Sequence, residues 1–235
     1  MKVFAISDLH LSLEEDSQNL YKPMSVFGQH WENHHLKIAE NWCRHVGEND
    51  LVLIPGDHSW AINLVQAKPD LEFIGALPGH KLLIKGNHDY WWESISKVRK
   101  NIPNKVYALQ NDAWQFGEVG VCGTRGWITP YDEGFDPQDD AKIYEREALR
   151  LEMSLKMLQK LQTSIKIALL HYPPSIGNKE SLFTNLLEQY QVDYCVYGHV
   201  HSEYHHYIDG FRQTVDYHLV SCDYLDFNPK LITEL

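Results

Sequence analysis

Five short stretches of this 235-residue chain place potential metal-binding side chains directly after an apolar run of strand length. The apolar runs cover residues 2–6, 51–54, 81–84, 165–170 and 194–197. The stretches that follow them are Asp8-Leu9-His10, Gly56-Asp57, Gly86-Asn87-His88-Asp89, His171-Tyr172-Pro173 and Gly198-His199-Val200-His201. Strand ends that face the same edge of a sheet are where an α/β protein assembles a site. The pattern therefore predicts that the five stretches can converge.

Length and composition predict one folded domain covering residues 1–235. A hydrophobic content of 43% and an aromatic content of 12% are typical of a globular protein. A chain of this length buries a sizeable core without disulfides. The four cysteines stand far apart with no C-x-x-C pair, so we expect reduced thiols that serve as small apolar residues.

The charge balance narrows the possible partners. Thirty-two acidic residues outnumber 21 basic ones, giving a net charge of −11, so we expect no broad basic face and no binding of long nucleic acid.

The apolar run from Val3 to Ile6 is too short for a signal peptide. No segment approaches the ~20 apolar residues needed to span a bilayer. We expect a cytoplasmic protein without a membrane partner, and the sequence does not indicate its oligomeric state.

Hydrophobic periodicity predicts alternating strands and helices in the first half of the chain. Strands 2–7, 51–54 and 81–84 alternate with helical segments 31–46, 61–76 and 90–100, and Pro69 is expected to divide the second helical segment. Three short antiparallel strands are predicted next, at 106–109, 113–116 and 119–122. Four further strands (165–170, 193–197, 205–208 and 212–220) and two helices (139–162 and 182–190) follow. This order predicts an α/β protein with a mixed sheet, or two packed sheets, and helices outside.

The spacing of the polar residues favours more than one metal ion. Asp8 and His10 are two positions apart, so in an extended chain they project to the same side and can reach one ion. The same holds for His199 and His201 around Val200. Divalent cations bind carboxylate oxygens, imidazole nitrogens and amide oxygens. Two such pairs, far apart in sequence, argue for at least two ions.

In order along the chain, the motifs D-x-H, G-D, G-N-H-[DE], a lone H and G-H-x-H resemble the signature of the calcineurin-like metallophosphoesterase superfamily. The resemblance implies an α/β (α+β) fold, a two-layered mixed β-sandwich flanked by helices, with a bimetal centre at one edge. It implies a first metal on Asp8, His10 and His201, with Asp57 bridging to a second metal. The second metal would bind Asn87, His171 and His199, and His88 would face the substrate phosphate.

This resemblance implies a metal-dependent phosphohydrolase acting on a small phosphomonoester or phosphodiester. Two cations ~3.5 to 4 Å apart would bind the phosphate, and a metal-bridging hydroxide would attack phosphorus in line with the leaving oxygen. Manganese, iron or zinc would suit the mixed ligand set. His88 would stabilise the transition state or protonate the leaving group, making His88 and Asp57 the expected catalytic residues. The alternatives are a non-catalytic scaffold of the same fold that binds a protein partner, and a protein phosphatase.

One position departs from the family pattern. In the protein Ser/Thr phosphatase branch the G-D motif is followed by an acidic residue that orients the histidine, but here the run is Gly56-Asp57-His58-Ser59-Trp60. Trp60 stands at the acidic position, which weakens the protein phosphatase alternative. Asp89 is the candidate replacement for the missing carboxylate.

Four further residues are candidates for binding substrate. Arg125, in a glycine-flanked loop, either binds phosphate or forms a surface salt bridge. Tyr21 and Lys22 belong to loop 11–30, longer than the ~2 to 6 residues usual for a βα connection, which either holds a planar part of the substrate or packs as a surface flap. Trp91 either borders the pocket or packs in the core.

Overall fold

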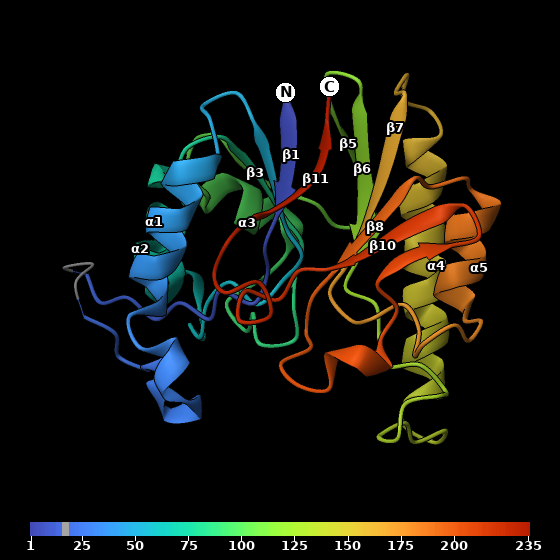
Figure 1. Ribbon diagram of the computed structural model, residues 1–235, viewed down its shortest axis with the longest axis horizontal. Coiled ribbons are helices and arrows are strands. Elements are labelled where there is room, and N and C mark those ends of the chain that lie inside the picture. Colours follow the sequence, from blue (N-terminus) through green and yellow to red (C-terminus); the bar gives the residue numbers. More distant parts are fainter. Residues whose placement is uncertain (16–18) are drawn as a thin grey trace. The chain divides into compact units, whose positions relative to one another are not determined.

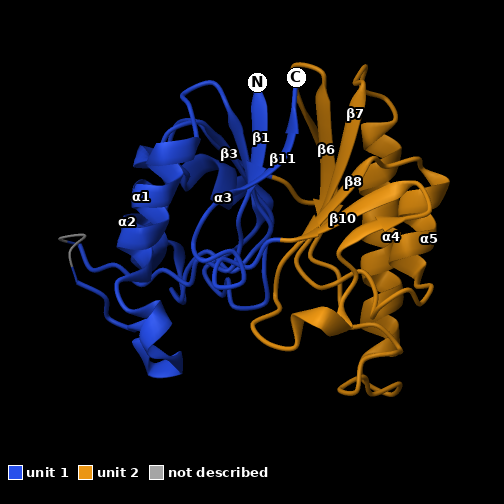
Figure 2. Cartoon of the chain, in the orientation of Figure 1, with its two compact units in different colours: residues 1–108, 220–235 blue, residues 109–219 orange. Residues whose placement is uncertain are grey.

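The computed structural model describes residues 1–15 and 19–235. Residues 16–18, which belong to the loop predicted at 11–30, lie outside the described residues. Two compact units make up the chain, as Figure 2 shows: Met1–Ala108 with Val220–Leu235, and Leu109–Leu219. Each unit contains one mixed sheet with its own helices. That the whole chain is one domain stays a prediction.

The sheet of the first unit contains five strands in the order β11-β1-β2-β3-β4. Strands β1 to β4 are parallel, and β11 pairs antiparallel with β1. The parallel strands are largely buried, as expected for a sheet covered by crossover helices. The strands are β1 (Lys2–Ala5), β2 (Leu51–Ile54), β3 (His80–Leu83), β4 (Val106–Ala108) and β11 (Lys230–Glu234).

Three α-helices accompany this sheet, and α1 and α2 lie together beside it in Figure 1. Ile38 and Trp42 of α1 and Leu71 and Ile74 of α2 are buried in one core with sheet residues such as Val52. Asn63 begins α2 by accepting a hydrogen bond from the Gln66 N–H at 3.0 Å. The helical elements are η1 (Met24–Phe27), η2 (Gln29–Trp31), α1 (His34–His45), α2 (Leu64–Ala76) and α3 (Ile95–Asn101).

Buried Lys81 of β3 joins the end of α2 to the sheet. Its ammonium donates to the carbonyl oxygens of Leu77 at 2.6 Å, Gly79 at 2.9 Å and Gly75 at 3.2 Å. Carbonyl groups at a helix C-terminus have no partner within the helix, so this cation satisfies groups that water would otherwise have to reach. Burial lowers the pKa of Lys81 to about 8. The contact holds α2 against the strand that leads to the Gly86 turn.

The sheet of the second unit contains six strands in the order β5-β6-β7-β8-β10-β9. Strands β6, β7, β8 and β10 are parallel, while β5 and β9 are antiparallel edges. Buried residues from the strands, α4 and α5 form one core, and Figure 1 shows the two helices side by side. The elements are β5 (Ala113–Phe116), β6 (Val119–Thr124), α4 (Ala141–Leu158), β7 (Ile165–Leu170), α5 (Leu182–Gln189), β8 (Tyr194–Tyr197), η3 (Tyr204–His206), β9 (Gly210–Arg212) and β10 (Val215–Leu219).

Several predicted elements are corrected by the structure. Pro69 lies inside α2 and does not divide it, because burial of the flanking Ala67 and Leu71 keeps the helix packed despite the lost backbone hydrogen bond. Strand β4 joins the first sheet, parallel to β3, and is not part of an antiparallel set. Residues 205–208 contain a 3-10 turn where a strand was predicted, and β11, which the sequence did not predict, pairs with β1.

The predicted fold class is confirmed: each unit carries a mixed sheet flanked by helices. Within the described residues no helix combines the length and apolarity needed to cross a membrane.

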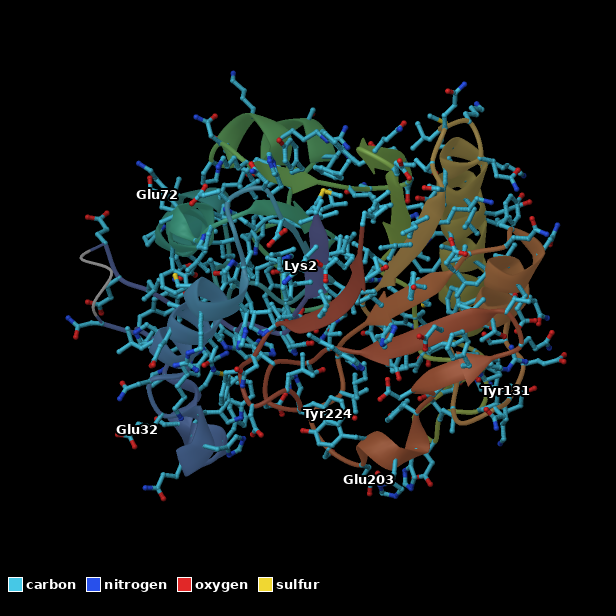
Figure 3. The ribbon with its side chains drawn as sticks, turned by 45° about the horizontal axis from the view of Figure 1, so that its top comes forward. Lys2, Glu32, Glu72, Tyr131, Glu203 and Tyr224 are labelled. Atoms are coloured by element: carbon cyan, nitrogen blue, oxygen red, sulfur yellow. The ribbon has the colours of Figure 1, made fainter. Side chains whose placement is uncertain are left out.

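Acidic side chains from both units lie at the surface, and three of them are labelled in Figure 3: Glu32, Glu72 and Glu203.

Candidate metal centre

The first unit brings Asp8, His10 and Asp57 together where β1 and β2 end. All three are buried, with exposed fractions of 0%, 3% and 1%. A carboxylate oxygen of Asp8 lies within 4.8 Å of a ring nitrogen of His10, and likewise of a carboxylate oxygen of Asp57. His10 Nε2 is 3.8 Å from Asp57 Oδ2. This set of two carboxylates and an imidazole fits a divalent transition-metal ion.

The backbone around these residues is held in an uncommon conformation. Asp8, His10 and Asp57 have positive φ values of 58°, 44° and 53°, in the left-handed region. Such positions cost free energy and concentrate at functional sites, although Asp and His tolerate them better than most residues. The Asp8 N–H donates to Gly56 O at 3.1 Å, and the His10 N–H donates to Asp57 O at 3.0 Å. The two turns are therefore bonded to each other directly.

The turn after β3 packs on Asp57 with no room for a side chain at Gly86. A Cβ atom at Gly86 would lie 2.1 Å from Asp57 Oδ1 and 2.3 Å from the Asp57 nitrogen, well inside van der Waals contact. The backbone N–H of His88 donates to Asp57 Oδ1 at 2.8 Å. Glycine at this position lets the third turn reach the carboxylate and brings Asn87 and His88, both half-buried, beside it.

Charge is crowded around Asp57. Burial raises the pKa of its carboxyl well above the usual value, and the neighbouring carboxylates of Asp89 and Asp8 raise it further. Backbone N–H groups of His88 and Asn87 oppose this effect. A bound cation would favour the ionised form of such a carboxyl. The electrostatics of this set therefore fit a metal centre.

Asp89 organises the turn that carries Asp57. It is fully buried and accepts backbone hydrogen bonds from Gly86 at 2.7 Å, His58 at 2.9 Å and Asp57 at 3.0 Å. Its Oδ2 also lies 2.9 Å from His58 Nδ1. Burial raises the pKa of Asp89, but His58 and the donated hydrogen bonds lower it by more, so this carboxyl stays ionised. These bonds hold the Asp57 turn, a role that the sequence did not predict.

Asp8 is oriented by three residues that the sequence did not single out. Ser7 and Ser221 both donate hydroxyl hydrogen bonds to Asp8 Oδ2, the latter at 3.1 Å, and the Cys222 thiol donates to the Asp8 carbonyl at 3.0 Å. Ser221 is 213 residues away in sequence. The segment after β10 returns to pair with Ser7, and no local pattern could have indicated this contact.

Trp60 lies against two imidazoles of this site. Its ring stacks on His10 with centroids 4.8 Å apart and planes at 22°, and its centroid is 4.6 Å from that of His88. Lys22 Nζ lies 3.2 Å from the centroid of a Trp60 ring. An aromatic ring, with the cation above it, therefore lies at the position where the protein Ser/Thr phosphatases have an acidic residue.

The other substrate-binding candidates of this unit lie in different surroundings. Trp91 has no exposed surface and its indole N–H donates to Asp89 at 2.9 Å, so it packs behind the turn and offers no surface to a substrate. Tyr21 is 37% exposed. Burial, and then the charge of Asp70, raise the pKa of Tyr21 to about 12, while a hydrogen bond with Ser59 opposes them.

The second unit gathers its own histidines where β7 and β8 end. The rings of His171 and His199 have centroids 5.0 Å apart, and the Gly198 N–H donates to the His171 carbonyl at 3.1 Å. His199 has a φ of 72°, the same left-handed conformation as the aspartates of the first unit. His171 is buried, His199 half-buried and His201 exposed. This group offers imidazole nitrogens from two neighbouring turns.

Arg125 lies beside this histidine group. Its carbonyl accepts hydrogen bonds from the N–H groups of His171 at 2.9 Å and Tyr172 at 3.0 Å. Its guanidinium carbon is 4.6 Å from the Trp127 ring centroid, and the ring centroids of Trp127 and Tyr172 are 5.1 Å apart. The ring centroids of Tyr172 and His199 are 4.1 Å apart. A stacked, half-buried guanidinium next to the histidine turns is well placed to bind an anion, and that role stays a prediction.

The sequence matches the calcineurin-like phosphoesterase family over residues 1–203. This match covers most of the chain and includes all seven predicted metal ligands. The chain therefore belongs to the calcineurin-like phosphoesterase family. Proteins of this family use divalent metals, in agreement with the acidic and imidazole groups gathered at the strand ends.

Two relatives give further context. A probable cyclic nucleotide phosphodiesterase of Coxiella burnetii is 23% identical over 229 residues, which are 92% of this chain and 80% of that protein. An uncharacterised protein of Methanocaldococcus jannaschii is 27% identical over 121 residues, 48% of this chain. That match spans 65% of the archaeal protein, just under two thirds of its length.

Two solved structures share the fold. Phosphopantetheinyl hydrolase from Mycobacterium tuberculosis has a TM-score of 0.56 at 11% identity, covering 100% of this chain and 96% of its own. A protein of unknown function from Aquifex aeolicus has a TM-score of 0.50 at 16% identity, covering 98% and 95%. At these identities the likeness concerns the fold alone.

Proposed function

We propose that this protein hydrolyses a small phosphomonoester or phosphodiester with the help of two divalent metal ions. The observation that carries this proposal is the buried set of Asp8, His10 and Asp57, held on left-handed backbone in a chain of the calcineurin-like phosphoesterase family. When bound, manganese, iron or zinc ions would neutralise phosphate charge and supply hydroxide for in-line attack at neutral pH.

The proposed ligands come from both units. One ion would be held by Asp8, His10 and His201, and the other by Asn87, His171 and His199. Asp57 would serve both ions, because an anionic carboxylate offsets repulsion between two cations better than a neutral imidazole does. Support within each unit comes from the convergence of Asp57 with Asp8 and from the adjoining rings of His171 and His199.

His88 is the proposed proton donor to the leaving oxygen, or the stabiliser of charge that develops on the phosphoryl group. Its backbone N–H donates a hydrogen bond to Asp57 Oδ1. Its ring centroid lies 4.6 Å from that of Trp60 and 5.7 Å from that of His10. The backbone of His88 therefore contacts the carboxylate that would serve both ions, and its imidazole neighbours that of His10, which supports this role. A histidine there can act on the phosphate without being a ligand.

A small substrate is proposed because the net charge of −11 disfavours binding along a nucleic acid. The relative named as a probable cyclic nucleotide phosphodiesterase supports a diester as one option. Trp60, at the position of an acidic residue in the protein Ser/Thr phosphatases, argues against a protein substrate. The non-catalytic scaffold alternative predicts a protein without stoichiometric metal.

The test combines metal content with hydrolysis. After reconstitution with manganese, iron or zinc, we expect about two ions per chain and hydrolysis of p-nitrophenyl phosphate or its bis-ester. Asp57→Ala and His199→Ala, one change in each unit, should both lower metal content, and each should lower kcat by about 100-fold or more, because several kcal/mol of charge stabilisation disappear.

The matched control is His205→Ala, which removes an exposed histidine of the second unit that the proposal does not use. This variant should keep both metal content and activity. Full activity in Asp57→Ala or His199→Ala would overturn the two-metal mechanism. A folded wild-type protein that binds no metal would favour the scaffold alternative.

A further inference from the structure

Lys22 lies over an aromatic ring that contacts two histidines of the candidate metal centre. Its Nζ is 3.2 Å from the centroid of a Trp60 ring, while Trp60 stacks on His10 and packs against His88. Lys22 itself is exposed and Trp60 is half-buried. All four residues belong to the first unit, so this arrangement stands within one compact body.

The backbone on both sides of this contact is fixed. The buried Ser12 hydroxyl donates to the Lys22 carbonyl at 2.8 Å and accepts from the Lys22 N–H at 3.3 Å. Trp60 donates its backbone N–H to Leu11 O at 2.9 Å and its indole N–H to Met24 Sδ at 3.2 Å. The cation is therefore presented from a fixed position, and only its side chain needs to be held by the ring.

We propose that Lys22 and Trp60 form an anion-binding subsite in which Lys22 contacts the phosphoryl group of the substrate and favours a phosphomonoester over a phosphodiester. This inference rests on the proposed function, because it takes the phosphate to lie beside His10 and His88. Lys22 is the binding residue. Trp60 is a positioning residue that holds the ammonium at this place.

The physical basis is the charge of the two substrate classes. A phosphomonoester carries close to two negative charges above its second pKa of about 6, whereas a diester carries one. The ring quadrupole attracts the ammonium, and the N–H groups that point away from the ring can donate to phosphate oxygens. A lysine ammonium is a compact charge, so its attraction to a dianion exceeds that to a monoanion.

The experiment compares kcat/KM for p-nitrophenyl phosphate and for bis(p-nitrophenyl) phosphate at about pH 8, where the monoester is a dianion. Lys22→Ala should lower the monoester value roughly fivefold through KM while changing the diester value much less, in line with the magnitude of an exposed charge contact. Lys22→Arg should restore the monoester preference. Lys68→Ala, which removes an exposed lysine of α2, is the matched control and should change neither value.

The positioning role of Trp60 is tested by measuring whether the effects of changes at Trp60 and Lys22 depend on each other. Trp60→Phe keeps a ring under the ammonium and should preserve the monoester preference, whereas Trp60→Leu should lose it. In the Trp60→Leu background, Lys22→Ala should have little further effect, because the two residues act as one unit. Equal losses for both substrates in Lys22→Ala, or independent effects of the two changes, would overturn the proposed subsite.

A measurement of phosphate binding tests the subsite independently of hydrolysis. Calorimetry with inorganic phosphate and the metal-loaded protein should show weaker binding in Lys22→Ala than in wild type or Lys68→Ala. If wild type hydrolyses neither ester, the proposed function fails, and phosphate binding alone decides the subsite. Undetectable phosphate binding in wild type, or the same affinity in Lys22→Ala, would reject it.

Discussion

At the scale of single residues, the candidate centre depends on side chains that touch Asp57 and Asp8. Ligand-type residues were recognisable in the sequence because D-x-H, G-D, G-N-H-D and G-H-x-H have a characteristic order and spacing. The residues that hold them were not, because Ser221 and Asp8 meet only through the return of the chain after β10. The sequence suggested Asp89 as a partner of its neighbour His88, whereas the carboxylate accepts hydrogen bonds from Asp57 and His58 and so holds the Asp57 turn.

Gly86→Ala is the residue-scale prediction. An added Cβ would overlap Asp57 Oδ1 and the Asp57 nitrogen, so the turn must shift by more than a rotamer change allows. We expect metal affinity to fall by about tenfold or more, as for residues that orient metal ligands, with the fold retained by circular dichroism.

Gly134→Ala is the control for that change, because a Cβ at Gly134 meets nothing within 4 Å. Metal titration of the two variants makes the comparison. Wild-type metal affinity in Gly86→Ala would show that the close packing on Asp57 has no part in metal binding.

At the scale of elements, Asp70 connects α2 to the beginning of loop 11–30 and to the turn that carries Asp57. Its buried carboxylate accepts from the Ser59 hydroxyl and from the Leu13 N–H, the latter at 2.7 Å. The helical periodicity of residues 61–76 gave no reason to single out this residue. Only the packing of α2 beside both loops shows why a carboxyl is buried there.

Asp70→Asn tests this connection through pH. Burial raises the pKa of Asp70 to about 7, against opposing hydrogen bonds from Ser59 and Leu13, whereas the unfolded chain has a value of about 4. Between these values the folded chain binds more protons, so the contribution of Asp70 to stability is fully present below about pH 4 and is lost as pH rises to about 7. The free energy of unfolding of Asp70→Asn, relative to wild type, should therefore rise over this interval and level off above it.

Urea unfolding of both proteins in chelator, at several pH values across that interval, measures this difference. Other titrating groups are common to both proteins and cancel in the comparison. A difference that stays constant with pH would mean that Asp70 titrates at the same pH in the folded and unfolded chains.

At the scale of the whole molecule, the proposed metal ligands are divided between two compact units. Ions that bind only the folded chain stabilise it by about 2.7 kcal/mol at a free concentration one hundred times the Kd. Chelator should therefore lower the Tm of the reconstituted wild type, with a larger shift at higher metal concentration.

Differential scanning calorimetry with and without chelator checks this prediction. The chelator-dependent shift should be small in Asp57→Ala, in the first unit, and also in His199→Ala, in the second. A full shift in His199→Ala would show that His199 contributes nothing to metal binding.

The fold class, the order of most strands and helices, and the family could be predicted from the sequence alone. Each of these depends on local periodicity or on motifs of a few adjacent residues. Tertiary structure decided which sheet β4 and β11 join, the burial of Trp91, and the contacts of Trp60 with His10, His88 and Lys22. These features depend on pairs of residues far apart in the chain, whose contact becomes favourable only when the strands have paired and excluded water.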